Sequence, residues 1–202
     1  MEREDIDTRQ AAADLLTLME SWISQARESG VHDPVPMAFV TVGADGRPSS
    51  RMVGLKRIED ERLIFSSALW TRKARELSVN PHVSLLFYWP ELGRQLQIAG
   101  TAEVGGRDLA RQLFSERPLA HRLQSIVSRQ GEPIDDLQVL RQRHAHLMSV
   151  LEREPDCPPD WGAISVAVEA IEFWEQASDR MHRRLFFERD ERGDWRHQLL
   201  SP

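Results

Sequence analysis

The sequence lacks several features that define large classes of protein. Cys157 is the single cysteine in 202 residues, so no internal disulfide framework can form, which fits a reducing compartment. No apolar run approaches the length of a membrane span, and no apolar segment follows the acidic start, residues 1–7, as it would in a signal peptide. We therefore expect a cytoplasmic protein that does not associate with a membrane.

Basic residues are outnumbered by acidic ones. The net charge of −6 argues against general nucleic-acid binding. The chain has no G-x-G-x-x-G, Walker, G-x-S-x-G or Cys-x-x-Cys motif. His144 and His146 are two positions apart and do not share a helix face, so we expect no metal site. The local clusters of arginine and lysine therefore need a smaller anionic partner.

Length and composition indicate an ordinary globular protein. Hydrophobic residues make up 41% of the 202 residues and charged residues 29%, which suits one domain over residues 1–202. We expect residues 1–36 to be a helix (Ile6 to Arg27) and a linker, and residues 106–155 to be a helical insertion beside the main fold.

Short apolar segments separated by turn residues dominate the rest of the chain. They predict strands at residues 39–42, 49–56, 63–67, 83–89, 94–103, 164–174, 184–189 and 195–200. Val83 to Trp89 is nearly all apolar and predicts a strand buried on both faces. Strands joined by tight turns before any long helix indicate a mainly β fold with flanking helices (α+β), an antiparallel barrel or sandwich.

A first basic cluster accompanies the early strands. It combines cations and hydroxyls at strand ends and at the start of a helix: Arg51, Lys56, Ser66, Ser67, Thr71, Arg72 and Lys73. Such an arrangement suits a phosphate, because unpaired N–H groups and the helix dipole favour an anion there. The alternative is a set of solvated surface charges.

A second basic cluster follows the aromatic pair Phe173-Trp174. If residues 178–185 enter a strand, Arg180, His182 and Arg184 line one face. Three cation-capable side chains on one face repel each other unless an anion lies among them. The alternative is an exposed edge strand whose charges block aggregation.

The order and spacing of several segments resemble the pyridoxine/pyridoxamine 5′-phosphate oxidase family, FMN-dependent flavoproteins with a dimeric split β-barrel fold. The resemblance covers nearly the whole chain from the first helix to Pro202. Its most specific segments are Arg51–Lys56, Thr71–Ala74, Asn80–Trp89, Arg94-Gln95, Ser128–Gln130, Glu172–Trp174 and Arg180–Arg184.

The resemblance implies roles for individual residues. The residues that fall on FMN-binding positions are Arg51, Ser66, Ser67, Arg72, Lys73, Gln95, Gln130, Trp174 and Arg184. Those that fall on substrate-binding positions are Lys56, Leu113, Arg117, His121, Arg180 and His182, and the last two are the expected catalytic residues. It also implies a homodimer with FMN between the subunits, a small-molecule substrate, and O2 as the oxidant that yields hydrogen peroxide.

Departures from the family pattern keep the substrate open. Leu113 stands where pyridoxine-phosphate enzymes have a phosphate-binding tyrosine, and His121 stands where they have a serine. Residues 125–130 and 178–184 also resemble the flavin oxidases of phenazine biosynthesis, which oxidise reduced tricyclic carboxylates. A third possibility is a flavin- or haem-binding module without turnover. Pyridoxine or pyridoxamine 5′-phosphate is the first substrate candidate.

Overall fold

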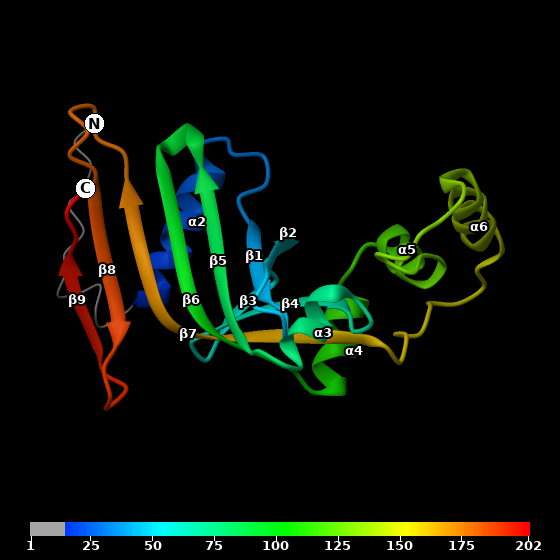
Figure 1. Cartoon of the computed structure of the whole chain (residues 1–202). Coiled ribbons are helices and arrows are strands. Elements are labelled where there is room, and N and C mark those ends of the chain that lie inside the picture. Colours follow the sequence, from blue (N-terminus) through cyan, green and yellow to red (C-terminus); the bar gives the residue numbers. More distant parts are fainter. Residues whose placement is uncertain (1–14) are drawn as a thin grey trace.

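The computed structural model describes residues 15–202 and contains one antiparallel sheet with helices on its flanks (Figure 1). The strands are β1 (Pro36–Val42), β2 (Pro48–Gly54), β3 (Arg57–Glu59), β4 (Arg62–Ala68), β5 (His82–Trp89), β6 (Arg94–Val104), β7 (Trp161–Glu175), β8 (Arg183–Arg189) and β9 (Trp195–Leu199). The helices are α2 (Leu15–Glu28), α3 (Arg72–Leu77), α4 (Arg107–Ser115), α5 (Leu119–Val127), α6 (Leu137–Val150) and the 3-10 turn η1 (Pro90–Leu92).

Strand β7 is the centre of the sheet. The strand order is β2-β1-β5-β6-β7-β4-β3, and β8 and β9 continue the sheet from β7. With 15 residues, β7 is long enough to pair with β4 along residues 161–167 and with β8 along residues 170–175. The two ends of one strand therefore border different parts of the molecule.

The sheet curls where β6 meets the middle of β7. The register shifts between Ala99 and Gly100, as at a β-bulge, which bends a strand and increases its twist. A Cβ atom on Gly100 would lie 2.1 Å from the main-chain oxygen of Ala167. Only glycine permits this close approach, so residue 100 fixes the position of the bend.

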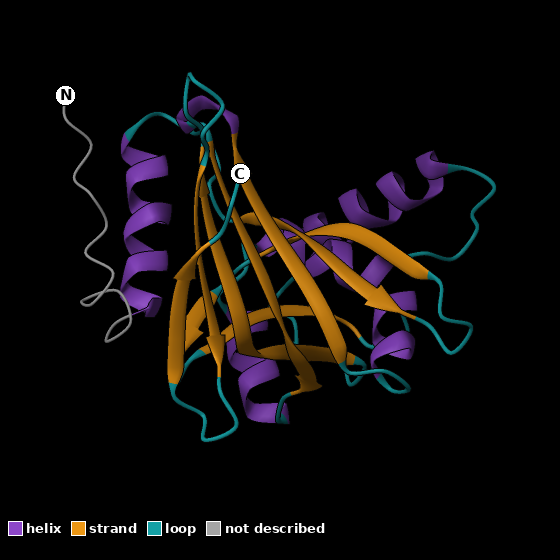
Figure 2. Cartoon of the chain, turned by 60° about the vertical axis from the view of Figure 1, so that its left-hand side comes forward, coloured by secondary structure: helices purple, strands orange, loops and turns teal. Residues whose placement is uncertain are grey.

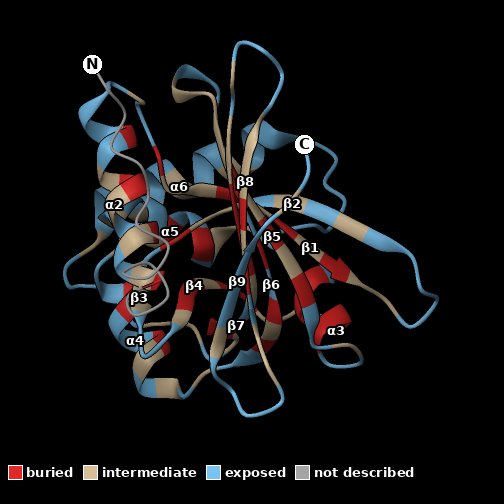
Figure 3. Ribbon diagram, turned by 90° about the vertical axis from the view of Figure 1, so that its left-hand side faces the viewer, coloured by how far each residue is buried: buried red, intermediate tan, exposed pale blue. Residues whose placement is uncertain are grey.

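The main core lies between the sheet and α2, which packs along one side of the strands (Figure 2). Helix α2 buries an apolar stripe of Leu15, Met19, Trp22, Ile23 and Ala26. The Trp22 ring lies 4.9 Å from that of Phe173 on β7 and 6.5 Å from that of Trp89 on β5. Figure 3 shows the same distribution, with the buried residues concentrated in the strands and in α2.

Helices α5 and α6 extend away from the sheet (Figure 1). Helix α4 packs on β7 and β4 through Leu113 and Phe114, whereas α6 contacts α5 and has no buried residue. The helical insertion expected at residues 106–155 therefore corresponds to three helices over residues 107–150. None of the described helices combines the length and the apolar character needed to cross a bilayer.

The predicted strands are all present, with three corrections. Strand 83–89 is not buried on both faces: Tyr88 is 59% exposed, because only alternate residues of β5 face α2. The predicted strand 49–56 ends at Gly54, and β3 follows at Arg57. Arg180 and His182 precede β8, so they do not share a strand face with Arg184. The part of the predicted first helix before Leu15 lies outside the described residues.

Candidate functional site

A buried carboxylate organises the first basic cluster. Glu76 on α3 accepts hydrogen bonds through Oε2 from Thr41 (2.5 Å) and Ser49 (2.6 Å). Its Oε2 also lies 3.3 Å from Arg51 Nη2, and its Oε1 accepts a 2.7 Å bond from Arg72 Nε. Strands β1 and β2 and helix α3 are thereby joined at one carboxylate, and two cations that the sequence predicted to act together lie on either side of it.

These hydrogen bonds stabilise the ionised form of the Glu76 carboxyl group. Burial on its own raises the pKa of the carboxyl, but the hydrogen bonds from Ser49, Thr41 and Arg72 outweigh it and lower the pKa to about 2. Arg51 donates further to Thr41 Oγ1 (2.6 Å) and to the main-chain oxygen of Phe39 (3.0 Å). The guanidinium is therefore held in place by bonds to β1 and to the Glu76 carboxylate on α3.

Lys73, next to this cluster, is a buried cation without a carboxylate. It is 5% exposed, and its ammonium group bonds to Thr71 Oγ1 at 3.2 Å. Among residues 15–202 it forms no ion pair. Burial and the nearby Arg51 lower the pKa of Lys73 to about 8. An uncompensated charge in this position favours an anionic ligand.

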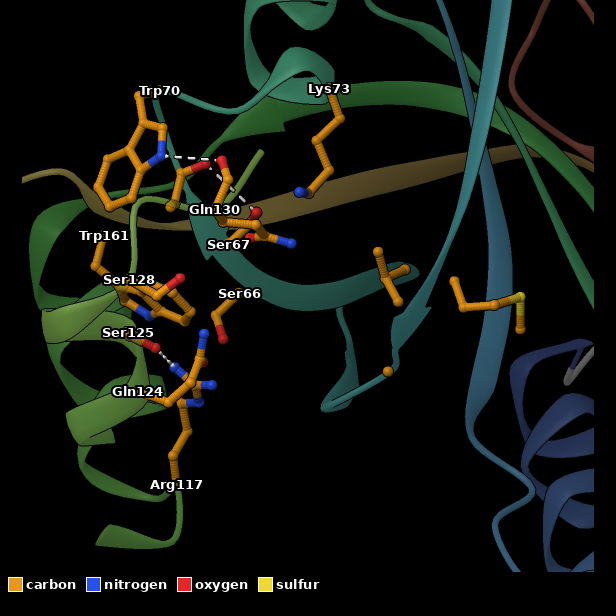
Figure 4. Close-up of a pocket in the computed structure, with 14 residues that line it drawn as sticks. Ser66, Ser67, Trp70, Lys73, Arg117, Gln124, Ser125, Ser128, Gln130 and Trp161 are labelled. Carbon is orange, nitrogen blue, oxygen red and sulfur yellow. Dashed lines mark hydrogen bonds between the residues drawn. The ribbon is translucent and has the colours of Figure 1, made fainter. Parts of the chain in front are cut away.

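Lys73 points into a cavity of about 230 Å³ at the start of β7 (Figure 4). The cavity is lined by Met52, Val53, Gly54, Ser66, Ser67, Ala68, Trp70, Lys73, Arg117, Gln124, Ser125, Ser128, Gln130 and Trp161. Lys73 and Arg117 enter it from opposite sides. Four of the residues predicted to bind FMN, namely Ser66, Ser67, Lys73 and Gln130, therefore share one cavity.

Arg117 is the second cation in this cavity. Its guanidinium lies 4.3 Å from the ring centre of Trp161, and Nη1 donates to Ser125 Oγ. Burial lowers the pKa of Arg117, and it has no ion-pair partner among the described residues. A π face and a hydroxyl do not neutralise a guanidinium, so this end of the cavity also suits an anion.

Three other predicted substrate residues lie outside this cavity. Lys56 is exposed and borders a separate cavity beneath α2, together with Arg27 and Arg57. Leu113 is 2% exposed and packs against Ile64 and Ala163 in the core. His121 is exposed on α5. Lys56 and Arg117 therefore line different cavities of the described chain.

Arg184 of the second basic cluster is part of a row of side chains across three strands. Gln95 on β6 lies opposite Trp174 on β7, which lies opposite Arg184 on β8. Glu172 accepts two hydrogen bonds from Arg184, at 2.7 Å to Nε and 3.0 Å to Nη2, and the pair raises the pKa of Arg184. Sheet pairing thus assembles three predicted FMN-binding residues that are far apart in sequence.

His182 lies against this row. Its ring centre is 4.8 Å from that of Trp174, and Nδ1 accepts a 3.1 Å hydrogen bond from the main-chain N–H of Ala177. A neutral ring with Nδ1 as acceptor carries its proton on Nε2. His182 can therefore donate a hydrogen bond to a ligand through Nε2.

Arg180 has an unusual backbone conformation. Its φ angle is +66°, a left-handed conformation that costs about 1–2 kcal/mol in a residue other than glycine. The turn is held by the Asp179 side chain, which accepts from the N–H of Met181 at 2.9 Å. Strain of this kind is concentrated at ligand-binding sites, which favours the predicted role of Arg180.

The two clusters lie at opposite ends of β7. Ser66 pairs with Ala163 near the start of that strand, and Trp174 lies near its end. The 11 residue steps from Ala163 to Trp174 correspond to roughly 36 Å along the strand. Figure 1 shows the two ends of the curved strand on opposite sides of the molecule. One small ligand cannot contact both clusters of the same chain.

Sequence patterns did not reveal the residues that hold these side chains. Glu76, Glu172, Trp70 and Trp161 contact predicted site residues but were not themselves predicted. The spacing of Arg72 and Glu76 by four residues on a helix was an available signal, since such pairs face each other. The pairing of Glu172 with Arg184 depends on strand register, which no local pattern gives.

A curled antiparallel sheet with flanking helices is the architecture of the split-barrel proteins. The chain belongs to the pyridoxamine 5′-phosphate oxidase family. Residues 23–150 match the family model described as pyridoxamine 5′-phosphate oxidase. Residues 161–202 match the pyridoxine 5′-phosphate oxidase C-terminal dimerisation region. The predicted family, its fold class and its oxidoreductase character are thereby confirmed, and the dimerisation region supports a homodimer.

Individual relatives are similar over most of their length. The chain is 35% identical over 202 residues to a pyridoxine/pyridoxamine 5′-phosphate oxidase of Burkholderia vietnamiensis, which covers 99% of this chain and 94% of the relative. It is 38% identical over 182 residues to the enzyme of the same name from Rubrobacter xylanophilus, covering 90% and 83%.

Two solved structures share the fold. PhzG from Burkholderia lata 383, in complex with tetrahydrophenazine-1-carboxylic acid, has a TM-score of 0.89 and 32% identity, covering 95% of this chain and 96% of that one. An FMN binding protein from Nostoc punctiforme, related to pyridoxamine 5′-phosphate oxidase, has a TM-score of 0.75 and 17% identity, covering 91% and 96%. At that identity the second likeness concerns the fold alone.

Proposed function

We propose that the protein is an FMN-dependent oxidase that acts on a small anionic heteroaromatic compound. The observation that carries this proposal is a pair of cations in one cavity, the buried Lys73 and the half-buried Arg117, neither of which has a carboxylate partner among the described residues. Two anionic groups, one of the cofactor and one of the substrate, would satisfy the two ends of the cavity.

The first cluster fits the phosphate of FMN. Arg51, Arg72 and Lys73 supply three positive charges and Glu76 one negative charge, which leaves two positive charges (3 − 1 = 2). A phosphate monoester carries about −1.5 to −2 at neutral pH. Ser66 and Ser67 add hydroxyl groups on the cavity that Lys73 lines, whereas Arg51 and Arg72 are not among its lining residues. The charge and the donors match the group that they would bind.

Residues of two subunits complete each site in this proposal. Gln95, Trp174 and Arg184 are too far along the sheet to reach a ligand bound at Lys73 of their own chain. A two-fold symmetric dimer brings the second cluster of one subunit to the first cluster of the other and forms two equivalent sites. The match of residues 161–202 to a dimerisation region supports this arrangement.

The protein side chains bind and orient the reactants. FMN, when bound, supplies the capacity to accept a hydride at N5 and to return the electrons to O2, which gives hydrogen peroxide. Arg117 holds the anionic group of the substrate, and His182 of the partner subunit donates from Nε2 to its reacting end. Arg180 adds a positive charge there. These groups orient the substrate and stabilise charge.

Pyridoxine or pyridoxamine 5′-phosphate is the first substrate candidate, because the curated relatives carry that activity in their names. A reduced tricyclic carboxylate is the second candidate. It is favoured by the cavity that Arg117 lines, which Lys56 does not share, because one guanidinium suits a carboxylate. PhzG was solved with such a carboxylate bound.

The test is anaerobic flavin reduction followed by peroxide release from the purified holoenzyme with each candidate. Reduction by one of the two compounds, with one peroxide formed per turnover on admission of air, is the expected result. A protein that binds FMN but is reduced by neither compound would be a flavin-binding module. A protein that does not bind FMN would overturn the proposal entirely.

A further inference from the structure

Trp70 joins two loops beside the cavity that Lys73 enters. It lies in the connection between β4 and α3, and it lines the cavity that Lys73 enters. Its indole Nε1 donates a 3.2 Å hydrogen bond to the main-chain oxygen of Gln130 (Figure 4). Gln130 belongs to the loop between α5 and α6, so the indole connects segments that are 60 residues apart.

Arg129 contacts the face of the same indole ring. Its guanidinium lies 4.1 Å from the ring centre of Trp70, and Nη1 bonds to Asp160 Oδ2 at 3.2 Å. The main-chain oxygen of Asp160 accepts in turn from the N–H of Leu69 at 2.8 Å. Residues 69–70, 129–130 and 160 thus form a closed ring of contacts, the Trp70 clasp.

The loop that carries Gln130 has little else to hold it. Within the described residues, its main-chain hydrogen bonds are local, from Ser128 to Gln124 and from Glu132 to Arg129. Gln130 itself is exposed, and Gly131 has a φ angle of +88°. Contacts with the Trp70 clasp therefore decide where the Gln130 side chain lies relative to the cavity.

We infer that Trp70 is a positioning residue that acts through Gln130 to retain the flavin. This inference rests on the proposed function, because Gln130 is a predicted FMN-binding residue. The indole contacts the main chain of Gln130, so its effect reaches the cofactor through the side chain of that residue. The clasp lowers the cost of ordering the loop when the flavin binds.

The test is a double-mutant cycle on the full-length dimer with Trp70→Phe and Gln130→Ala. Phenylalanine keeps an aromatic face for Arg129 but removes the N–H donor, and alanine at position 130 leaves the main-chain acceptor in place. A neutral hydrogen bond is worth about 0.5–1.5 kcal/mol, so Trp70→Phe should weaken FMN binding by about three- to tenfold. The same substitution in the Gln130→Ala background should add less than about twofold.

Trp195→Phe is the matched control. Trp195 also lies under an arginine, Arg189, at 4.4 Å, and its Nε1 also donates to an acceptor, Glu61 Oε1, at 3.3 Å. It lies on β9, away from the cavity, so FMN affinity should not change. Arg129→Gln disrupts the same clasp from the other residue and should also weaken FMN binding. It provides the test if Trp70→Phe does not fold.

Fluorescence titration with FMN and thermal unfolding of each apoprotein separate the outcomes. Equal weakening by Trp70→Phe in both backgrounds would show a general structural role and overturn the inference, as would unchanged affinity in Trp70→Phe and Arg129→Gln. Failure of the wild-type protein to bind FMN would instead overturn the proposed function, so the two failures are distinguishable.

Discussion

The Nζ atom of Lys73 lies 3.2 Å from Thr71 Oγ1, and this hydroxyl is the sole hydrogen-bond partner of the ammonium group among residues 15–202. A buried lysine with a hydroxyl in place of a carboxylate keeps its proton weakly, and its pKa is about 8. A bound phosphate would provide the missing negative charge. The affinity for FMN should therefore depend on whether Lys73 is already protonated.

The first prediction is a pH dependence of FMN binding. Because the folded-state pKa of Lys73 is about 8, below its usual 10.5, the unfolded chain binds more protons between these values, and the stability of the apoprotein gains with pH there. Phosphate binding has the opposite sign, since it requires the proton. The Kd for FMN should be constant from pH 7 to 8 and then rise towards tenfold per pH unit.

Fluorescence titrations at a series of pH values check this dependence. Lys73→Met should bind FMN weakly and lose the change near pH 8, whereas Lys56→Met, which alters an exposed lysine, should keep it. Riboflavin, which has no phosphate, should show no such change with the wild-type protein. A change of equal size for riboflavin would contradict the assignment to phosphate.

The second prediction concerns the substrate anion. Arg117→Met keeps an unbranched side chain beside Trp161 but removes the charge. Hydrogen bonds to charged groups are worth about 1.5–3 kcal/mol, so kcat/KM for the anionic substrate should fall roughly ten- to a hundredfold. FMN content should not change. Arg111→Gln, which removes an exposed arginine on α4, should leave the kinetics unchanged. Loss of FMN in Arg117→Met would instead place Arg117 on the cofactor.

The sequence predicted more of the fold than of the site. Alternation of apolar residues and turn signals predicted every strand except the three-residue β3 (Arg57–Glu59), because those signals are local and a strand of three residues is too short to show an alternation. The prediction that β5 is buried on both faces was wrong, because an apolar run such as Val83 to Trp89 suits a strand buried on one face or on both. Which side chains face the helix depends on α2, more than 50 residues earlier.

The site required information that only pairing supplies. The row of Gln95, Trp174 and Arg184 depends on the register of β6, β7 and β8. The sequence pattern at Arg180 and His182 suggested a strand, but the positive φ angle of Arg180 belongs to a turn. The resemblance to a family identified these residues, whereas the partners that hold them, such as Glu172, followed from the structure alone.

The third prediction uses the strained backbone at Arg180. Arg180→Gly removes the charge and also relieves the left-handed conformation, which costs about 1–2 kcal/mol outside glycine. Thermal stability should be unchanged or higher, while flavin reduction by the substrate slows at least tenfold. Asp60→Gly, at another positive φ angle in the β3–β4 turn, should affect stability similarly and leave the reduction rate unchanged. Stopped-flow reduction and thermal unfolding measure the two effects.

The fourth prediction concerns His182 as a hydrogen-bond donor. His182→Asn retains an acceptor for the Ala177 N–H but lacks the Nε2–H that points away from it. We expect slower flavin reduction, by roughly tenfold, with FMN affinity unchanged. His197→Asn is the control, because His197 also lies against an aromatic ring, that of Phe187 at 5.6 Å, but on β9. Equal reduction rates in wild type and His182→Asn would contradict the role of His182.

The central claim is that each flavin site combines the Lys73 cluster of one subunit with the Arg184 cluster of the other. The direct measurement is the FMN content of dimers refolded from a mixture of two variants, Lys73→Ala and Arg184→Ala. Each variant alone has two damaged sites and should retain little FMN. Random mixing makes half of the dimers mixed, and each mixed dimer has one intact site, so about a quarter of the wild-type FMN content should return. If each site lay within one chain, every site in the mixture would remain damaged, and no recovery of FMN would contradict the account.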